Sequence, residues 1–394
     1  MGVSKVNKLK DLIHELCPNG VEYKKLADCC VLEKGNTPIQ KAIPGEYPLV
    51  VTTEERKSCN TYQFDKPTVC IPLVSSRGHG VASLNRLYYQ EGKFALGNIL
   101  CGVTPINSDE LSAKFLFYYL NHKKDTLIVP LMRGGANVSL TVDSLKRVRV
   151  PVPPISVQCE IVRIFDKFES FGNELTAELV ARKKQYEYYR KQLLSFDASV
   201  PLKTINNVCI KVSSGGTPST SHSEYYNGTI PWLRTQEVDW RDIYDTAVKI
   251  TQQGMDNSSA KYVPKNCVIV AMYGATAAKV AINKIPLTTN QACCNLEIDP
   301  NQANYRYVFY WLSSEYENLK ALGQGSQSNI NAGVVKSYPI PVPSLDVQNK
   351  IVSLLDKFDI LCSDIAKGLP AEIEARQKQY DHYRNKLLTF KQLS

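Results

Sequence analysis

The chain has 394 residues, of which 43% are hydrophobic and 22% charged, a composition typical of a globular protein with room for two or three domains. There is no run of eighteen apolar residues, and Met1 to Lys10 holds no apolar stretch, so we expect neither a membrane span nor a secretory signal. We therefore expect a cytoplasmic protein. The formal net charge of +9 allows a polyanionic partner without requiring one.

Two long segments, residues 22–150 and 200–340, consist of short β-branched and aromatic runs separated by Gly, Pro and Asn. Such runs are typical of strands joined by turns, so each segment predicts a globular α+β domain. The clearest predicted elements are buried strands at Val69–Val74 and Cys267–Val270 and short amphipathic helices at Lys114–Asn121 and Arg306–Glu317.

A long helix is predicted after each segment by an apolar seam in steps of four and three residues. The first seam runs through Ile161, Phe165, Phe168, Gly172, Leu175, Leu179, Arg182, Tyr186, Tyr189, Leu193 and Phe196. The second runs through Ile351, Leu355, Phe358, Cys362, Ile365, Leu369, Ile373, Arg376, Tyr380, Tyr383, Leu387 and Phe390. Each helix would have about 40 residues and a length of roughly 60 Å. Because each seam can bury the other, we expect an antiparallel coiled-coil pair with the tyrosines in its core.

The two halves of the chain repeat one another. Leu145–Phe168 aligns with Val335–Phe358 without a gap at an offset of 190 residues, and Ala181–Phe196 matches Ala375–Phe390 at ten of sixteen positions. A period this long is too large for a solenoid. It predicts two copies of one domain-plus-helix unit, related by a pseudo-twofold internal repeat.

The second copy contains four extra residues between Phe358 and Ala375. Four residues are close to one helical turn, so the insertion lengthens the helix while nearly keeping its apolar face. Pro370 in the second helix and Gly172–Asn173 in the first are the expected positions of a kink.

The sequence lacks the familiar motifs of catalysis and metal binding. The twelve cysteines contain no Cys-x-x-Cys pair, and the five histidines have no partner at metal or triad spacing. No Gly-x4-Gly-Lys-Ser/Thr phosphate loop is present, and the Pro153–Pro154 pair lacks the neighbours of an amino-methyltransferase loop. We therefore expect no catalytic residue, metal or cofactor in this chain, and free cysteines that pack as small apolar side chains.

In their order and repetition, these features resemble the specificity subunits of Type I restriction–modification systems over essentially the whole chain. The resemblance rests on the Pro-x-Pro helix starts followed by Gln158 and Gln348, and on the helix ends Ala181–Phe196 and Ala375–Phe390. Further matching segments are Ser214–Pro218, Ile230–Arg234, Gly274–Lys279, Thr289–Ala292 and Thr176–Leu179, the last resembling a tetrapeptide whose copy number varies among members.

The resemblance implies two target-recognition domains, residues 1–150 and 199–340, each followed by a spacer helix, residues 151–198 and 341–394. Each domain would read one half of an asymmetric bipartite site in double-stranded DNA. The two helices would set the gap between half-sites and dock two modification (methyltransferase) subunits, with restriction/translocase subunits added in the full complex. S-adenosylmethionine, ATP and Mg²⁺ would be bound by those partners and not by this chain.

Base reading requires polar side chains on loops that reach base edges. The candidates in the first domain are Arg77, His79, Asn85, Arg86 and Arg133. The candidates in the second domain are Arg234, Gln236, Tyr273, Lys279, Ser326, Gln327 and Asn329. For each of them the alternative is a surface side chain or a loop-stabilising hydrogen bond, and Ser214–Pro218 is expected to be a structural turn.

The residues alone leave three other functions open. A DNA methyltransferase or nuclease with a degenerate active site would act as a purified chain, given S-adenosylmethionine or Mg²⁺. A coiled-coil adaptor that never touches DNA would show no salt-dependent DNA binding. A transcription regulator would bind DNA tightly without partner subunits.

Overall fold

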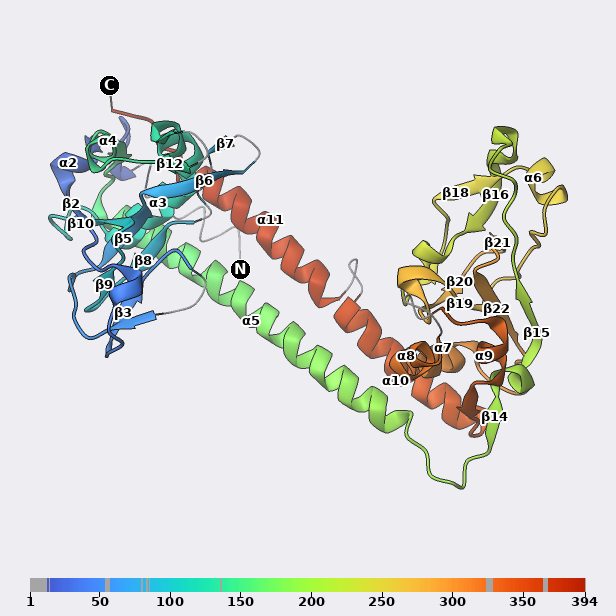
Figure 1. Cartoon of the computed structure of the whole chain (residues 1–394). Coiled ribbons are helices and arrows are strands. Elements are labelled where there is room, and N and C mark those ends of the chain that lie inside the picture. The colour runs from blue at the N-terminus through green and yellow to red at the C-terminus, as the bar shows by residue number, and fades with distance from the viewer. Residues whose placement is uncertain are drawn as a thin grey trace. The chain divides into compact units, whose positions relative to one another are not determined.

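The computed structural model (Figure 1) describes residues 13, 15–53, 57–78, 81–82, 84, 86–134, 137–323, 329–363 and 368–393. The chain divides into two compact units. Unit 1 comprises Met1–Thr176 and Glu372–Ser394, and unit 2 comprises Ala177–Ala371. Each unit holds one α+β domain and parts of the long helices.

The central sheet of unit 1 is antiparallel, with the strand order β2-β10-β5-β8. Its strands are β2 (Cys30–Lys34), β10 (Leu100–Pro105), β5 (Thr68–Pro72) and β8 (Tyr88–Gln90). Smaller sheets are formed by β4 (Lys57–Cys59), β3 (Tyr47–Val50) and β9 (Ala95–Leu96), by β11 (Arg133–Gly134), β12 (Asn137–Ser139), β6 (Val74–Gly78) and β7 (Val81–Ala82), and by β1 (Tyr23–Lys25) with β13 (Arg149–Pro151). The helices are α2 (Leu26–Cys29), α3 (Ala113–Leu127) and α4 (Val142–Lys146), with 3-10 turns η1 (Ile39–Lys41) and η2 (Val129–Leu131).

The central sheet of unit 2 has the equivalent order β15-β22-β19-β20, with β17 added at the edge. Its strands are β15 (Cys209–Ser214), β22 (Cys293–Ile298), β19 (Val268–Ala271), β20 (Val280–Asn283) and β17 (Asp242–Ile243). Smaller sheets are formed by β18 (Val248–Ile250), β16 (Tyr226–Leu233) and β21 (Thr288–Thr289), and by β14 (Leu202–Thr204) with β23 (Pro339–Pro341). The helices are α6 (Gln252–Asp256), α7 (Tyr305–Ser314), α8 (Tyr316–Ala321) and α9 (Ala332–Ser337), with 3-10 turns η3 (Ile205–Val208), η4 (Ser223–Tyr225), η5 (Thr235–Glu237) and η6 (Gly274–Thr276).

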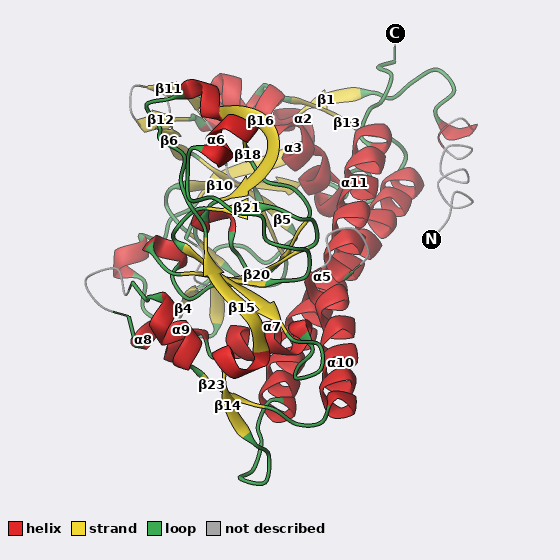
Figure 2. Cartoon of the chain, turned by 90° about the vertical axis from the view of Figure 1, so that its right-hand side faces the viewer, coloured by secondary structure: helices red, strands yellow, loops and turns green. Residues whose placement is uncertain are grey.

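Apolar strands and one covering helix form the core of each domain. Every residue of β5 and β19 is buried, as expected for continuous apolar runs of strand length. The predicted strand Val69–Val74 is divided at Leu73, after which β6 begins, and the helix predicted at Arg306–Glu317 is divided at Glu315 into α7 and α8. The helix α3 covers the sheet of unit 1, and α7 covers that of unit 2, where it also lies against the long helix α10 (Figure 2).

The first seam lies from Ile161 to Leu193 in one continuous helix, α5 (Ile155–Leu193), whose 39 residues agree with the predicted length and which Gly172–Asn173 does not interrupt. The last predicted seam positions, Phe196 and Phe390, lie beyond the helix ends. The second seam is carried by two helices, α10 (Leu345–Ser363) and α11 (Leu369–Leu387). The kink expected at Pro370 is therefore a helix start, because a proline in the first turn breaks no intrahelical hydrogen bond. Ile365 of this seam lies outside the described residues.

Within each unit the long helices pack in antiparallel pairs (Figure 1). In unit 1, Phe165 and Phe168 of α5 lie 5.7 and 6.0 Å, between ring centroids, from Tyr380 of α11. In unit 2, Tyr186 of α5 lies 6.0 Å from Phe358 of α10. These seam tyrosines pack between helices, as the heptad spacing predicts.

A buried glutamine fixes the start of each long helix to its domain. Gln158 and Gln348 are both fully buried. The side-chain oxygen of each accepts from the backbone N–H of the residue that caps α3 or α7, Ser112 at 2.9 Å and Asn304 at 2.8 Å. The side-chain amide nitrogen of each donates to the carbonyl oxygen of the second proline in the Pro-x-Pro motif, Pro153 at 2.7 Å and Pro343 at 2.8 Å. The repeated Gln therefore orients each domain on its helix.

Candidate nucleic-acid interface

In unit 2, two 3-10 turns that carry candidate DNA-reading residues are tied together. The turn η5 follows β16, and η6 connects β19 to β20. The Thr276 hydroxyl of η6 donates to the Thr235 carbonyl oxygen of η5 at 2.9 Å. The Asn329 side-chain oxygen accepts from the Gly274 N–H at 3.0 Å. These contacts gather the segments that carry Arg234, Gln236, Tyr273, Lys279 and Asn329.

The candidates on these turns differ in how far they are engaged within the protein. Gln236, Tyr273 and Asn329 are exposed, and 43% of the Tyr273 surface is accessible. Arg234 is half-buried, and its Nε lies 3.5 Å from Oε1 of Glu237. The other oxygen of Glu237 accepts from the Ala247 N–H at 2.8 Å. Arg234 thus takes part in holding its own loop, as does the side-chain oxygen of Asn329, while Gln236 and Tyr273 are exposed toward a ligand.

Lys279 follows η6 and is held by two neighbours. Its Nζ lies 2.6 Å from Oδ1 of Asp239 and 4.3 Å from the ring centroid of Trp240. This cation–π contact brings an exposed tryptophan to the candidate residues. Trp240 was missed in the sequence, where the only signal is an aromatic residue among the charged residues Asp239 and Arg241.

The backbone at this place adopts unusual conformations. Gly274, Trp240 and Ala278 have φ values of 78°, 47° and 68°. Glycine occupies the left-handed region freely, whereas a residue with a Cβ does so at a cost on the order of 1 to 2 kcal/mol. Two such residues close together indicate loops whose shape the surrounding fold imposes, a feature concentrated at functional sites.

Of the three candidates of unit 1 that the structure describes, two belong to the sheet β11-β12-β6-β7. Arg133 lies on β11, and Arg77 lies on β6, which pairs with β12 and β7. Arg133 is exposed, and its guanidinium donates to the carbonyl oxygen of Pro130 at 2.7 Å. Arg86 is also exposed and lies 5.0 Å from the ring centroid of Tyr88. The remaining candidates His79, Asn85, Ser326 and Gln327 lie outside the described residues.

The segment Ser214–Pro218, expected to be a turn, is the end of β15 followed by irregular chain, where two glycines allow close approach of the backbone. A Cβ at Gly215 would lie 1.9 Å from the Thr289 carbonyl oxygen, and the Gly216 N–H donates to that oxygen at 2.9 Å. Gly35 has the same role in unit 1, where a Cβ would lie 2.2 Å from a backbone oxygen of Gly97. This segment packs closely on the backbone of its own domain, and it is not a predicted DNA contact.

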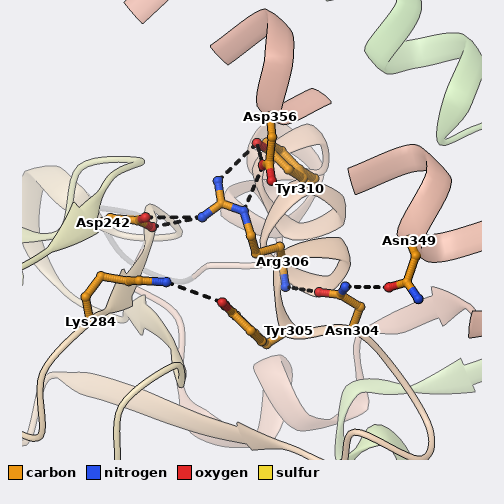
Figure 3. Close-up of polar contacts among 8 residues, drawn as sticks. All are labelled: Asp242, Lys284, Asn304, Tyr305, Arg306, Tyr310, Asn349 and Asp356. Carbon is orange, nitrogen blue, oxygen red and sulfur yellow. Dashed lines mark hydrogen bonds and ion pairs between the residues drawn. The ribbon is translucent and has the colours of Figure 1, made fainter. Parts of the chain in front are cut away.

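A polar network joins the domain of unit 2 to α10 (Figure 3). Arg306 of α7 lies 3.2 Å from Asp242 of β17 and 2.8 Å from Asp356 of α10. The Tyr310 hydroxyl donates to Asp356 at 2.5 Å, and burial, followed by this hydrogen bond, raises the pKa of the phenol. In unit 1 the equivalent aspartate, Asp166, accepts from Tyr118 at 2.7 Å and pairs with Lys114 at 2.9 Å.

The described part of the chain offers no metal site and no disulfide. No three His, Cys, Asp or Glu side chains there gather in a way that could hold a metal ion. The cysteines are free thiols, most of them buried, including Cys29–Cys30 and Cys293–Cys294. Among the described helices, none combines the length and apolar character needed to cross a membrane.

Similar folds occur among solved structures. The chain superposes on a Type I restriction–modification S subunit from M. genitalium with a TM-score of 0.59 and 17% identity, covering 93% of this chain and 96% of that one. For the HsdS subunit from Thermoanaerobacter tengcongensis the TM-score is 0.52 and the identity 14%, covering 95% and 96%. At these identities the likeness shows the fold, with its two α+β domains and its long helices.

Sequence relatives identify the family. The profile described as "Type I restriction modification DNA specificity domain" matches residues 18–182 and 200–375. The Type I restriction enzyme EcoR124I/EcoR124II specificity subunit of Escherichia coli is 35% identical over 302 residues, which cover 73% of each chain. A putative type I specificity subunit of Haemophilus influenzae is 30% identical, covering 94% of this chain and 96% of the relative. Since the profile matches both halves and these relatives match most of the chain, the protein belongs to the family of Type I restriction–modification DNA specificity subunits.

Proposed function

We propose that this chain reads an asymmetric bipartite site in double-stranded DNA, one half-site with each domain. The observation that carries the proposal is the form of the repeat. The same buried contacts of Gln158 and Gln348 fix each domain to a long helix, while the loops that carry the candidate residues differ between domains. Different loops on equivalent supports favour two different half-sites read in the same way.

The long helices would serve as the spacer between half-sites and as the dock for two modification subunits. Apolar side chains outside the seam support docking, because Val180 and Tyr188 of α5 are 51% and 60% exposed and Ile360 of α10 is 51% exposed. Restriction/translocase subunits would complete the complex in the cytoplasm. The partners would bind S-adenosylmethionine, ATP and Mg²⁺, and this chain would contribute no catalytic residue. Family membership supports this role over that of an enzyme or an adaptor.

Methylation mapping tests the proposal directly. The chain is expressed with the modification subunit of its own system in a methylation-free host, and the genome is sequenced for N6-methyladenine. We expect a single motif of two different short blocks around an unspecified gap. A complex that binds S-adenosylmethionine but leaves the genome unmethylated contradicts the proposal, and a symmetric or ungapped motif contradicts the assignment of one half-site to each domain.

Two variants test the division of labour. Insertion or deletion of four residues at Thr176–Leu179 is expected to change the gap while both half-sites stay the same, because one helical turn is added or removed. Replacement of residues 200–340 by the corresponding domain of a relative is expected to change one half-site only. An unchanged gap, or a change in both half-sites, would show that the helices or the domains have been assigned the wrong task.

A further inference from the structure

Trp240 has an unusual position for a tryptophan. It precedes β17 in the left-handed conformation, with φ at 47°, and 40% of its surface is exposed. The other two tryptophans serve the fold: Trp232 is buried, and the Trp311 indole N–H donates to the Pro339 carbonyl oxygen at 2.9 Å. Although the backbone conformation is disfavoured, part of the Trp240 side chain stays open to a ligand.

One backbone contact and two side-chain contacts hold Trp240 in place. Its backbone N–H donates to the Val280 carbonyl oxygen at 2.8 Å. The Lys279 ammonium lies 4.3 Å from the indole centroid, and the Tyr316 ring meets it edge-on at 5.1 Å with an interplanar angle of 78°. An aromatic side chain already fixed in this way loses little conformational entropy when it meets a ligand.

Trp240 also lies beside the gathered loops of the second domain. It is three residues after η5, and Lys279 is three residues after η6, so the contact between them extends the pairing of the two turns. The strands β17 and β15 form opposite edges of the central sheet, so Ile210 and Lys211 of β15 lie at the far edge of the same domain.

We propose that Trp240 is a DNA-contacting residue of the second domain, whose indole packs on a deoxyribose or a thymine methyl group while the adjacent Lys279 binds a phosphate. The inference rests on the proposed function and adds an apolar contact to its polar candidates. The bases of a duplex are stacked on one another, so sugars and thymine methyl groups are the apolar surfaces that an indole can reach, and a cation beside the indole binds the phosphates that link the sugars. An ammonium has three N–H donors, so Lys279 can bind a phosphate oxygen without leaving Asp239.

The test measures DNA binding by the full chain assembled with its modification subunit, on the duplex identified by methylation mapping and at several KCl concentrations. Trp240→Ala is expected to weaken specific binding about tenfold with the same salt slope, because an apolar contact releases no counterions. Lys279→Gln is expected to weaken binding and to reduce the salt slope by about one. Trp240→Phe keeps an aromatic face and should retain part of the affinity.

Matched controls separate a contact from a structural effect. Ile210→Ala and Lys211→Gln remove an exposed apolar and an exposed basic side chain at the far edge of the sheet and should leave binding unchanged. Wild-type affinity of Trp240→Ala overturns the inference, as does an equal loss for Trp240→Ala and Ile210→Ala, in both cases with the proposed function intact. If Trp240→Ala lowers the melting temperature, its loss of binding could come from a damaged fold, so Trp240→Phe and Trp240→Leu are compared instead. DNA affinity that is kept by Trp240→Phe and lost by Trp240→Leu supports an aromatic contact, and equal affinity of these two variants overturns it. A wild-type complex without sequence preference would overturn the proposed function and this inference with it.

Discussion

The two domains agree where they meet the long helices and differ where they carry their candidate DNA-reading residues. Gln158 and Gln348 make matching hydrogen bonds, and Asp166 and Asp356 each accept from a tyrosine hydroxyl of the covering helix. Among the described candidates, Arg77 and Arg133 of unit 1 lie in a small sheet, whereas those of unit 2 lie around two 3-10 turns. The repeat thus preserves the contacts that orient a domain and leaves the presented loops free to diverge.

The junctions, by which we mean the contacts of α3 with α5 and of α7 with α10, differ in their cation, which is Lys114 in unit 1 and Arg306 in unit 2. Lys114 pairs with one aspartate, and its side chain is 36% exposed. Arg306 is 18% exposed and bridges Asp242 and Asp356, which belong to the domain and to the long helix. A planar guanidinium can serve two carboxylates at fixed angles, whereas an ammonium acts as a point charge. The domain of unit 2 should therefore depend more on its cation than that of unit 1.

The largest expected effect tests what the junctions share. Gln158→Leu and Gln348→Leu should each lower the free energy of unfolding by about 3 kcal/mol, because buried backbone groups lose their hydrogen-bond partner. The loss should be confined to the mutated unit, which hydrogen exchange at α3 and α7 reports. The control Gln377→Leu changes an exposed glutamine of α11 and should have an effect within about 0.5 kcal/mol. Equal loss of protection in both units would contradict independent fixation.

The second prediction tests where the junctions differ. Arg306→Met should lower the free energy of unfolding by about 2 to 3 kcal/mol, because two partly buried carboxylates lose the cation that bridges them and then repel each other. Lys114→Met should cost less than about 1 kcal/mol, since its ion pair is more exposed. Urea denaturation of both variants gives the comparison. If Arg306→Met combined with Asp242→Asn is no more stable than Arg306→Met alone, the repulsion argument is wrong.

Much of this fold could be predicted because the repeat marks it twice. The seam positions gave the long helices, and the apolar runs gave β5 and β19, which are buried throughout. The meaning of Gln158 and Gln348 could not be derived from sequence, because a glutamine at a helix start is equally suited to solvent. Its burial depends on α3 and α7 arriving from about 45 residues away in the chain.

The candidate interface was less predictable, because it too depends on segments that are distant in the chain and meet only in the fold. Gln236, Tyr273 and Asn329 were chosen from loop context, and only the fold brings their segments together. Arg234 has the expected residue type, but Glu237 engages it within its own loop. Trp240 could not be found by pattern, because its left-handed backbone and its contact with Lys279 are properties of tertiary structure.

A third prediction compares the two helix pairs. Gly172 lies in the seam beside a pocket of about 510 Å³ lined by α5 and α11, whereas Cys362 at the matching seam position of α10 is 2% exposed. A Cβ at Gly172 would meet nothing within 4 Å. Gly172→Ala should therefore raise the free energy of unfolding by about 0.5 to 1 kcal/mol through helix propensity alone. Thermal unfolding measures the effect.

The control for that substitution is Gly254, a helical glycine beside which there is no space for a Cβ atom. A Cβ at Gly254 would lie 2.6 Å from the Tyr225 carbonyl oxygen, so Gly254→Ala should destabilise unit 2 although it also lies in a helix. A stabilised Gly254→Ala would mean that propensity outweighs the close approach. A destabilised Gly172→Ala would mean that the pocket in the helix pair of unit 1 is maintained by contacts that a methyl group disturbs.

The smallest expected effect is a difference in acid sensitivity. Burial, followed by the charges of Lys123 and Arg384, lowers the pKa of His122 on α3 to about 4. The unfolded chain therefore binds a proton below about pH 6.5 that the folded chain takes up only near pH 4, so this histidine makes unit 1 less stable as the pH falls through that window. Because His122 is partly exposed, the loss should be about 1 kcal/mol or less.

His122→Gln should remove this part of the pH dependence while leaving stability at pH 8 nearly unchanged. The matching position of α7 is Ser314, so unit 2 lacks the group and should not show the same slope. Hydrogen exchange of α3 and α7 between pH 6.5 and 4, corrected for the intrinsic exchange rate, separates the two units. If α3 keeps its acid sensitivity in His122→Gln, the charged groups between α3 and the long helix, and not the His122 imidazole, control how unit 1 responds to acid.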